Sequence, residues 1–297
     1  MKRALALLAV TIAVVIPALA QQPGSTGTLL VAHGASTEWN AQVERLASQA
    51  HLSGPIEICY IMGPDAATHL FQDAAARLVA KGATRIVVVP LLVSSHSEHY
   101  EQVRWLSGQT DSLSAIMREH TEHAGHARAQ VAVPMVVARA LDDSPAMAQV
   151  LADRGKALAQ GDVSKRALFL VGHGPNSAED YAAWMSNLRR VADSVRARSG
   201  FGDVRVDVVR DDAPAEVRNE AVTRVRELIA MQYQITGDSV VVVPVLISRG
   251  RISRETFMKD LAGLPVVYSG DPLLPHPALS QWLESRVAEG QAVAVRP

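Results

Sequence analysis

The chain has 297 residues, of which 48% are hydrophobic and 20% are charged. This balance is typical of a globular protein and excludes a disordered chain or a coiled coil. Lys and Arg together number 29 against 30 Asp and Glu, so the chain has no strong net charge to attract nucleic acid or anionic lipid. We therefore expect any ligand to be held by local contacts.

The first twenty residues predict a secretory signal peptide. Two basic residues precede an apolar run over residues 4–16, and an A-x-A triplet ends at Ala20. The alternative is a retained membrane anchor, because the run is only slightly shorter than the roughly 20 residues that span a bilayer. The small residues after the run favour cleavage after Ala20. We then expect a periplasmic or secreted protein without stable membrane insertion.

Strand-like and helix-like segments alternate in the first half of the chain. Val, Ile and Leu run without polar alternation in several short segments, which is typical of strands covered on both faces by helices. The alternation predicts a doubly wound parallel α/β sheet, with a polar insertion over residues 101–130. The predicted strands are 28–32, 56–61, 86–93 and 131–137, and the predicted helices are 38–50 and 66–81.

The same order of motifs occurs twice. In each copy an apolar strand runs into a His-Gly pair, and a later valine-rich strand contains a proline. We therefore expect two tandem repeats of one small doubly wound α/β domain, over residues 21–152 and 153–297, with a cleft between them. The matching segments are 28–39 with 167–181, 87–94 with 240–248, and 133–151 with 264–283.

Histidines follow two strands of the first copy. His33 ends the first strand, and His96 comes soon after the third. Ligands of parallel α/β sheets bind beyond the carboxyl ends of the strands, so the two side chains can face one ligand. Imidazole binds divalent cobalt, nickel, iron and zinc, and it can also take a proton near neutral pH. The alternative for His33 alone is a turn histidine with satisfied hydrogen bonds.

The segments LLVAHGAS and VVVPLLVSSHSEHY, in this order and strand context, resemble the sirohydrochlorin cobaltochelatase and ferrochelatase family. These are the class II tetrapyrrole chelatases of the CbiX/SirB type. The resemblance is close in the first half of the chain and partial in the second. It implies a chelatase-like fold and insertion of Co²⁺ or Fe²⁺, or of Ni²⁺, into a sirohydrochlorin-like tetrapyrrole. By motif matching, His33 and His96 would bind the metal and accept pyrrole protons, with His99 as a further metal ligand or as a contact for a substrate carboxylate.

The second copy keeps the strand-end His173 but not the later histidines. Its corresponding segment reads SRGRISRE and contains Arg249 and Arg251. We therefore expect one metal site, in the first half, and a degenerate C-terminal domain. The arginines can hold substrate carboxylates through their two-pronged donors, and His173 can face the shared cleft. The alternatives are a solvated loop and a remnant of the duplication.

One position departs from the family pattern. Members usually carry an acidic residue just after the second strand, where this chain has Met62 and Gly63, with Asp65 as a possible substitute. This departure keeps a second hypothesis open, an exported metal-binding or tetrapyrrole-binding protein without catalysis. A solute-binding protein would share the two-lobed plan but would leave the histidines unexplained. No P-loop or dinucleotide fingerprint occurs, so we expect no nucleotide cofactor.

The insertion carries a further row of histidines at His120, His123 and His126. On a helix this spacing lets consecutive pairs share a metal ion, which would suit a metal-collecting lid over the cleft. The alternative is a polar insertion whose histidines have no joint role. The remaining histidines have no evident partners in the sequence and are expected to be structural or exposed: His51, His69 and His276.

Overall fold

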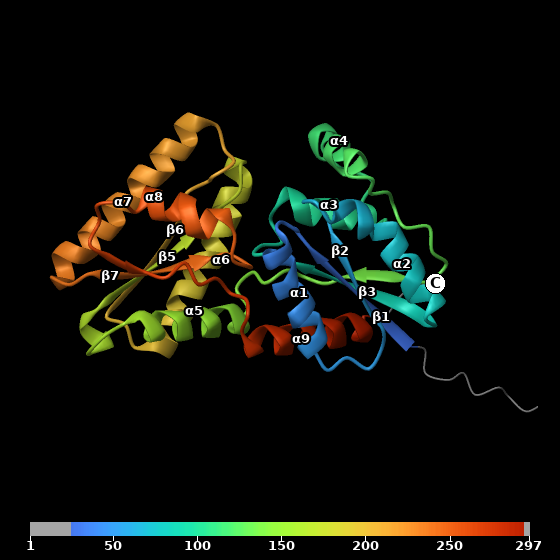
Figure 1. Ribbon diagram of the computed structural model, residues 1–297, viewed down its shortest axis with the longest axis horizontal. Helices are drawn as coiled ribbons and strands as arrows, with labels where there is room; N and C mark the ends of the chain where they lie inside the picture. Colours follow the sequence, from blue (N-terminus) through green and yellow to red (C-terminus); the bar gives the residue numbers. More distant parts are fainter. Residues whose placement is uncertain (1–24, 294–297) are drawn as a thin grey trace, which may run out of the picture.

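The computed structural model describes residues 25–293 and contains two four-stranded sheets, all of whose strand pairs are parallel (Figure 1). The strand order is β2-β1-β3-β4 in the first sheet and β6-β5-β7-β8 in the second. The predicted α/β fold with two tandem doubly wound repeats is therefore confirmed. The predicted signal peptide lies outside the described residues. Within residues 25–293, no helix is long and apolar enough to cross a membrane.

The first sheet departs from the prediction in two places. The helix expected over residues 66–81 is divided, because Leu70 has an extended backbone and only the segment after it forms a regular α-helix. The fourth strand is limited to three residues. The strands are β1 (Ser25–Ala32), β2 (Ile56–Tyr60), β3 (Ala83–Leu91) and β4 (Met135–Val137), with helices α1 (Thr37–Gln49), α2 (Phe71–Ala80), α3 (Glu98–Leu106) and α4 (Ala115–His123).

The second sheet repeats the first in register. Pro90 of β3 pairs with Val31 of β1, and Pro244 of β7 pairs with Val171 of β5, so the prolines occupy equivalent places in the two central strand pairs. The strands are β5 (Ala167–Gly172), β6 (Asp203–Val208), β7 (Val240–Val245) and β8 (Val266–Tyr268), with helices α6 (Ala178–Ser199), α7 (Ala215–Thr236) and α8 (Phe257–Asp260).

Each half is covered by the helix that ends the other repeat (Figure 1). Helix α5 (Pro145–Leu158) packs on the second sheet, where a Cβ atom at Gly155 would lie 3.0 Å from the Leu168 side chain. Helix α9 (Pro277–Ala292) packs on the first sheet, where a Cβ atom at Gly290 would lie 2.6 Å from Val87. One apolar cluster consequently runs through both halves. The predicted division between residues 152 and 153 falls inside α5.

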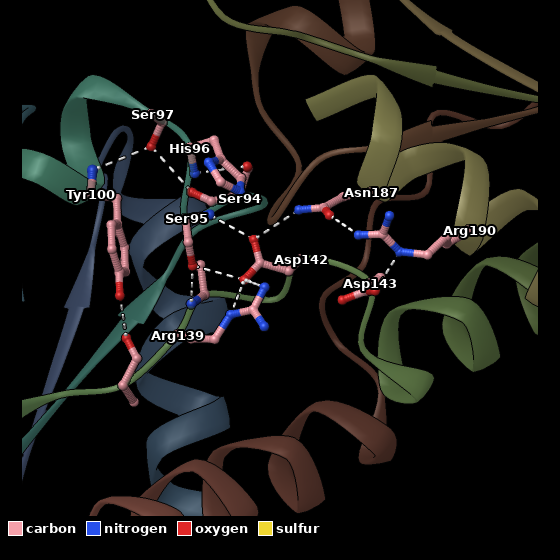
Figure 2. Close-up of polar contacts among 12 residues, drawn as sticks. Ser94, Ser95, His96, Ser97, Tyr100, Arg139, Asp142, Asp143, Asn187 and Arg190 are labelled. Carbon is pink, nitrogen blue, oxygen red and sulfur yellow. Dashed lines mark hydrogen bonds and ion pairs between the residues drawn. The ribbon is translucent and has the colours of Figure 1, made fainter. Parts of the chain in front are cut away.

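A buried carboxylate joins the halves at the loop after β3 (Figure 2). Asp142 is 3% exposed and accepts hydrogen bonds from the Ser95 backbone N–H at 2.7 Å and the Ser95 hydroxyl at 2.8 Å. It also accepts from Arg139 at 3.1 Å and from Asn187 on α6 at 3.3 Å. Its φ of 48° is left-handed, a conformation that Asp tolerates better than most residues. Because donors arrive from both halves, Asp142 holds the loop over residues 94–97 against α6.

We predict that Asp142→Ala lowers the free energy of unfolding by about 3 kcal/mol, because it leaves several buried donors without an acceptor. Urea denaturation measures this change. Asp143→Ala is the matched control, since the neighbouring carboxylate forms a half-exposed ion pair with Arg190 at 2.7 Å. It should cost about 1 kcal/mol or less. Equal losses in the two variants would contradict the role of Asp142.

Candidate functional site

His33 is held at the end of β1 by a tight turn. Its Nδ1–H donates to the Gly34 carbonyl at 2.8 Å, and its own carbonyl accepts from the Met62 N–H at 2.7 Å. Gly34 has a φ of 83°, and a Cβ atom there would lie 2.3 Å from the Met62 carbonyl oxygen, so only glycine fits. Because a carbonyl can only accept, Nδ1 carries the proton of the neutral ring. Nε2 is then unprotonated and available to a ligand.

His99, rather than His96, packs against His33. The His33 and His99 ring centroids lie 5.0 Å apart with their planes at 85°. Ser97 caps α3 by accepting from the Tyr100 N–H at 3.2 Å, which places His99 in the first helical turn. The His96 side chain is exposed, and its carbonyl accepts from the Trp184 indole N–H at 2.6 Å. Of the three predicted metal ligands, the structure brings the rings of His33 and His99 into contact, and the role of His96 stays a prediction.

A buried chain of hydrogen bonds orients the His99 ring. The Thr121 hydroxyl donates to the Met117 carbonyl on α4, so it must accept from the Gln102 amide nitrogen, which lies 3.0 Å away. The Gln102 carbonyl oxygen then faces His99 Nδ1 at 3.1 Å and can only accept. Nδ1 of His99 therefore carries a proton and Nε2 is bare, as in His33. The sequence gives no sign of this support, because it comes from the insertion.

Burial keeps both imidazoles neutral. It lowers the pKa of His33, and it lowers the pKa of His99 to about 4, where the charge of His33 acts in the same direction. The hydrogen bonds of His33 to Gly34 and of His99 to Gln102 oppose these shifts but do not cancel them. At pH 7 both Nε2 atoms therefore keep a free lone pair that can bind a cation.

The C-terminal half presents His173 in the same manner. Its Nδ1–H donates to the Gly174 carbonyl at 2.9 Å, and Nε2 lies 3.2 Å from Oδ2 of Asp212. The charge of Asp212 acts to raise the pKa of both His33 and His99, so the carboxylate lies near both imidazoles. Asp65, the predicted substitute for the family's acid, instead accepts a hydrogen bond from Asn40 at 2.7 Å.

Sequence reasoning missed Asp211 and Asp212, although a signal for them exists. The two residues come three and four positions after the end of β6, in DVVRDD, at the place where the first copy reads ICYIMGPD. A comparison of the two repeats at this position would have shown that the second copy has the acid that the first lacks.

The predicted carboxylate-binding arginines are placed differently from one another. Arg249 forms an ion pair with Asp271, whereas the exposed Arg251 has no ion pair within residues 25–293. Arg254 pairs with Glu38 at the start of α1, so this loop contacts the first half. The binding role of these arginines stays a prediction.

A cavity of about 380 Å³ lies beside His99. Its wall includes Gln102, Met117, His120 and His123 from the insertion. His126 is separate from this row, because it is buried and bonds to the Tyr60 carbonyl at 3.1 Å and the Phe71 N–H at 3.2 Å. The evenly spaced histidines therefore divide into two at the cavity and one that fastens the insertion to the fold.

We predict that Gln102→Leu weakens Co²⁺ binding at His33 and His99 about 10–100-fold, because it removes the acceptor that fixes the His99 tautomer. Broadening of the His99 ring-proton signals in NMR spectra during a Co²⁺ titration measures binding at this place. Gln72→Leu is the matched control, since that amide also fastens the insertion, at Gly125, but at an exposed position. Wild-type affinity in Gln102→Leu would contradict the proposed support.

Comparisons with known proteins show what this chain is similar to. The CbiX family model matches residues 27–158. No significant match occurs among curated protein sequences.

The structure of SirB from Bacillus subtilis with Fe³⁺ is 19% identical over 90% of this chain and 96% of that chain, with a TM-score of 0.59. SirB from Bacillus subtilis subspecies spizizenii in complex with cobalt is 17% identical over 90% and 95%, with a TM-score of 0.58. DR2241 from Deinococcus radiodurans, a multi-domain protein with structural similarity to chelatases, is 19% identical over 91% and 56%, with a TM-score of 0.59. Residues 27–158 are thus similar to the CbiX family, and the described chain has a chelatase-like fold of two repeats.

Proposed function

We propose that the protein inserts a divalent metal ion into a sirohydrochlorin-like tetrapyrrole. The observation that carries this proposal is the pair of facing imidazoles, His33 and His99, each with an unprotonated Nε2. Both lie within the CbiX segment, and the similar SirB structures are described with Fe³⁺ and with cobalt. Imidazole accepts Co²⁺, Fe²⁺ and Ni²⁺, so all three are candidate substrates.

The two imidazoles would serve first as metal ligands and then as bases. Nε2 of His33 and Nε2 of His99 would hold the incoming ion. As the metal forms bonds to the ring nitrogens, two pyrrole N–H bonds break, and the two protons pass to the Nε2 atoms that the metal has left. Release of these protons to solvent restores the site. A positioned general base typically contributes about 10²–10⁴-fold to such a step.

The cavity beside His99 would receive part of the tetrapyrrole. Its volume of about 380 Å³ falls within the roughly 300–1,000 Å³ typical of ligand pockets, and Met62 and Met117 give it apolar walls. Arg251 would bind carboxylates at the edge of the ring. Arg249 and His173 would also bind them, after releasing the aspartates with which they are now paired. The reaction needs no nucleotide.

Rates of Co²⁺ insertion into sirohydrochlorin, followed by absorbance, test the proposal. We expect His33→Ala and His99→Ala each to lower the rate about 100-fold or more, because each removes a ligand that is also a base. His96→Ala is the matched control and should keep a rate within about threefold of the wild type, since its side chain is exposed.

Two results would go against the proposal. Insertion by the wild-type protein no faster than the uncatalysed reaction would support a non-catalytic metal-binding or tetrapyrrole-binding protein instead. A loss in His96→Ala as large as that in His99→Ala would return His96 to the metal site.

We further propose that the chain is exported after cleavage at Ala20, on the basis of the signal-like segment over residues 1–20. Mass spectrometry of the protein recovered from the periplasmic fraction of a Gram-negative expression host should show Gln21 as the first residue. Retention of the full-length chain in the cytoplasm would contradict export.

A further inference from the structure

The C-terminal half contains an imidazole and two carboxylates to which the proposed function gives no role in metal binding. His173 Nε2 lies 3.2 Å from Oδ2 of Asp212. His173 Nδ1–H already donates to the Gly174 carbonyl, so in the neutral ring Nε2 has only a lone pair to offer. A carboxylate oxygen also only accepts. Two acceptors face each other at hydrogen-bond distance, and a positive charge, either a proton or a metal cation, is needed between them.

The spacing of these atoms suits a metal ion. Bonds of about 2.0–2.2 Å to nitrogen and oxygen, with the ligand atoms 3.2 Å apart, subtend an angle of about 100° at the metal. This value lies between octahedral and tetrahedral geometry. Asp211 supplies a third ligand, because one atom from each of His173, Asp211 and Asp212 lies within 4.8 Å of the others. Within residues 25–293, this is the one group of three such side chains that meets this spacing.

The turn that carries the two aspartates is fixed to the turn that carries His173. Arg210, which precedes them, has a left-handed φ of 53° and donates through its backbone N–H to the His173 carbonyl. Its side chain donates to the Pro175 carbonyl at 3.0 Å. This conformation is strained for a residue other than glycine, and the surrounding hydrogen bonds hold it in place. The three candidate ligands are therefore presented from two turns tied together.

The charges of the group also favour a cation. One oxygen of Asp211 accepts from Arg218 at 2.9 Å, while the Asp212 side chain is 68% exposed and the His173 side chain 24%. A neutral imidazole with two carboxylates offsets the charge of a divalent ion, whereas His33 and His99 provide two neutral ligands. Mixed nitrogen and oxygen ligands suit Co²⁺, Fe²⁺, Ni²⁺ and Zn²⁺.

We propose that His173, Asp211 and Asp212 form a second site for a divalent transition-metal ion, on the C-terminal wall of the cleft. Both halves have a histidine at the end of the first strand. Its partner is a second imidazole in the N-terminal half and a pair of carboxylates in the C-terminal half. This site does not depend on the proposed reaction, because a protein that inserts no metal would still bind an ion there.

Equilibrium dialysis against Co²⁺ tests the second site in a purified protein that carries His33→Ala and His99→Ala. This background lacks both imidazoles of the first site, and we expect it to retain one Co²⁺ ion per chain. Adding Asp212→Asn, at an exposed position, or His173→Ala should weaken that binding by about tenfold or more, since loss of even an outer-shell partner typically costs about 10–100-fold. Circular dichroism confirms that each variant is folded.

The matched control is His51→Ala in the same background. His51 also lies beside a single carboxylate, with its Nδ1 3.4 Å from Glu284, but its side chain is 93% exposed. Its loss should leave Co²⁺ binding unchanged. The proposal is overturned if the variant with His33→Ala and His99→Ala binds no Co²⁺. It is also overturned if neither Asp212→Asn nor His173→Ala changes the Co²⁺ affinity of that variant. Neither outcome bears on metal insertion at His33 and His99, which the sirohydrochlorin assay measures separately.

Discussion

The exchange of the last helix of each repeat is the constraint on which the rest of the structure depends. Helix α5 covers the second sheet and α9 covers the first, and the glycines that face the sheets, Gly155 and Gly290, allow the close approach. The two halves therefore share one close-packed apolar cluster, which fixes their positions relative to each other.

The same His-Gly turn occurs once in each half. A histidine at the end of a central strand donates Nδ1–H to the carbonyl of the next glycine, which directs a bare Nε2 away from the main chain. The surroundings of that atom then determine its chemistry. His33 has a neutral partner, the buried imidazole of His99, whereas His173 has an anionic partner, the carboxylate of Asp212. Duplication has thus produced two different donor sets from the same turn.

Sequence patterns predicted the parts of this structure that depend on local periodicity. The strands, the tandem repeat and the strand-end histidines follow from apolar runs and repeated motifs. Such patterns do not show which of His96 and His99 contacts His33. The contact depends on the start of α3 at the Ser97 cap, which sets the direction of the His99 side chain. Gln102 and Thr121 were missed for a related reason, since their effect on His99 requires the insertion to fold back as α4. The helix exchange is a tertiary arrangement that no local pattern contains.

The proposed chemistry depends on His33 and His99 being neutral rings with Nδ1 protonated and Nε2 free. Nitrogen-15 NMR of the histidine side chains at pH 7 tests it most directly, because the protonated and unprotonated ring nitrogens have distinct chemical shifts. The account predicts that both residues show Nδ1–H and an unprotonated Nε2 whose signal changes when Co²⁺ is added. An Nε2–H tautomer, or a doubly protonated ring at pH 7 in either residue, would contradict it.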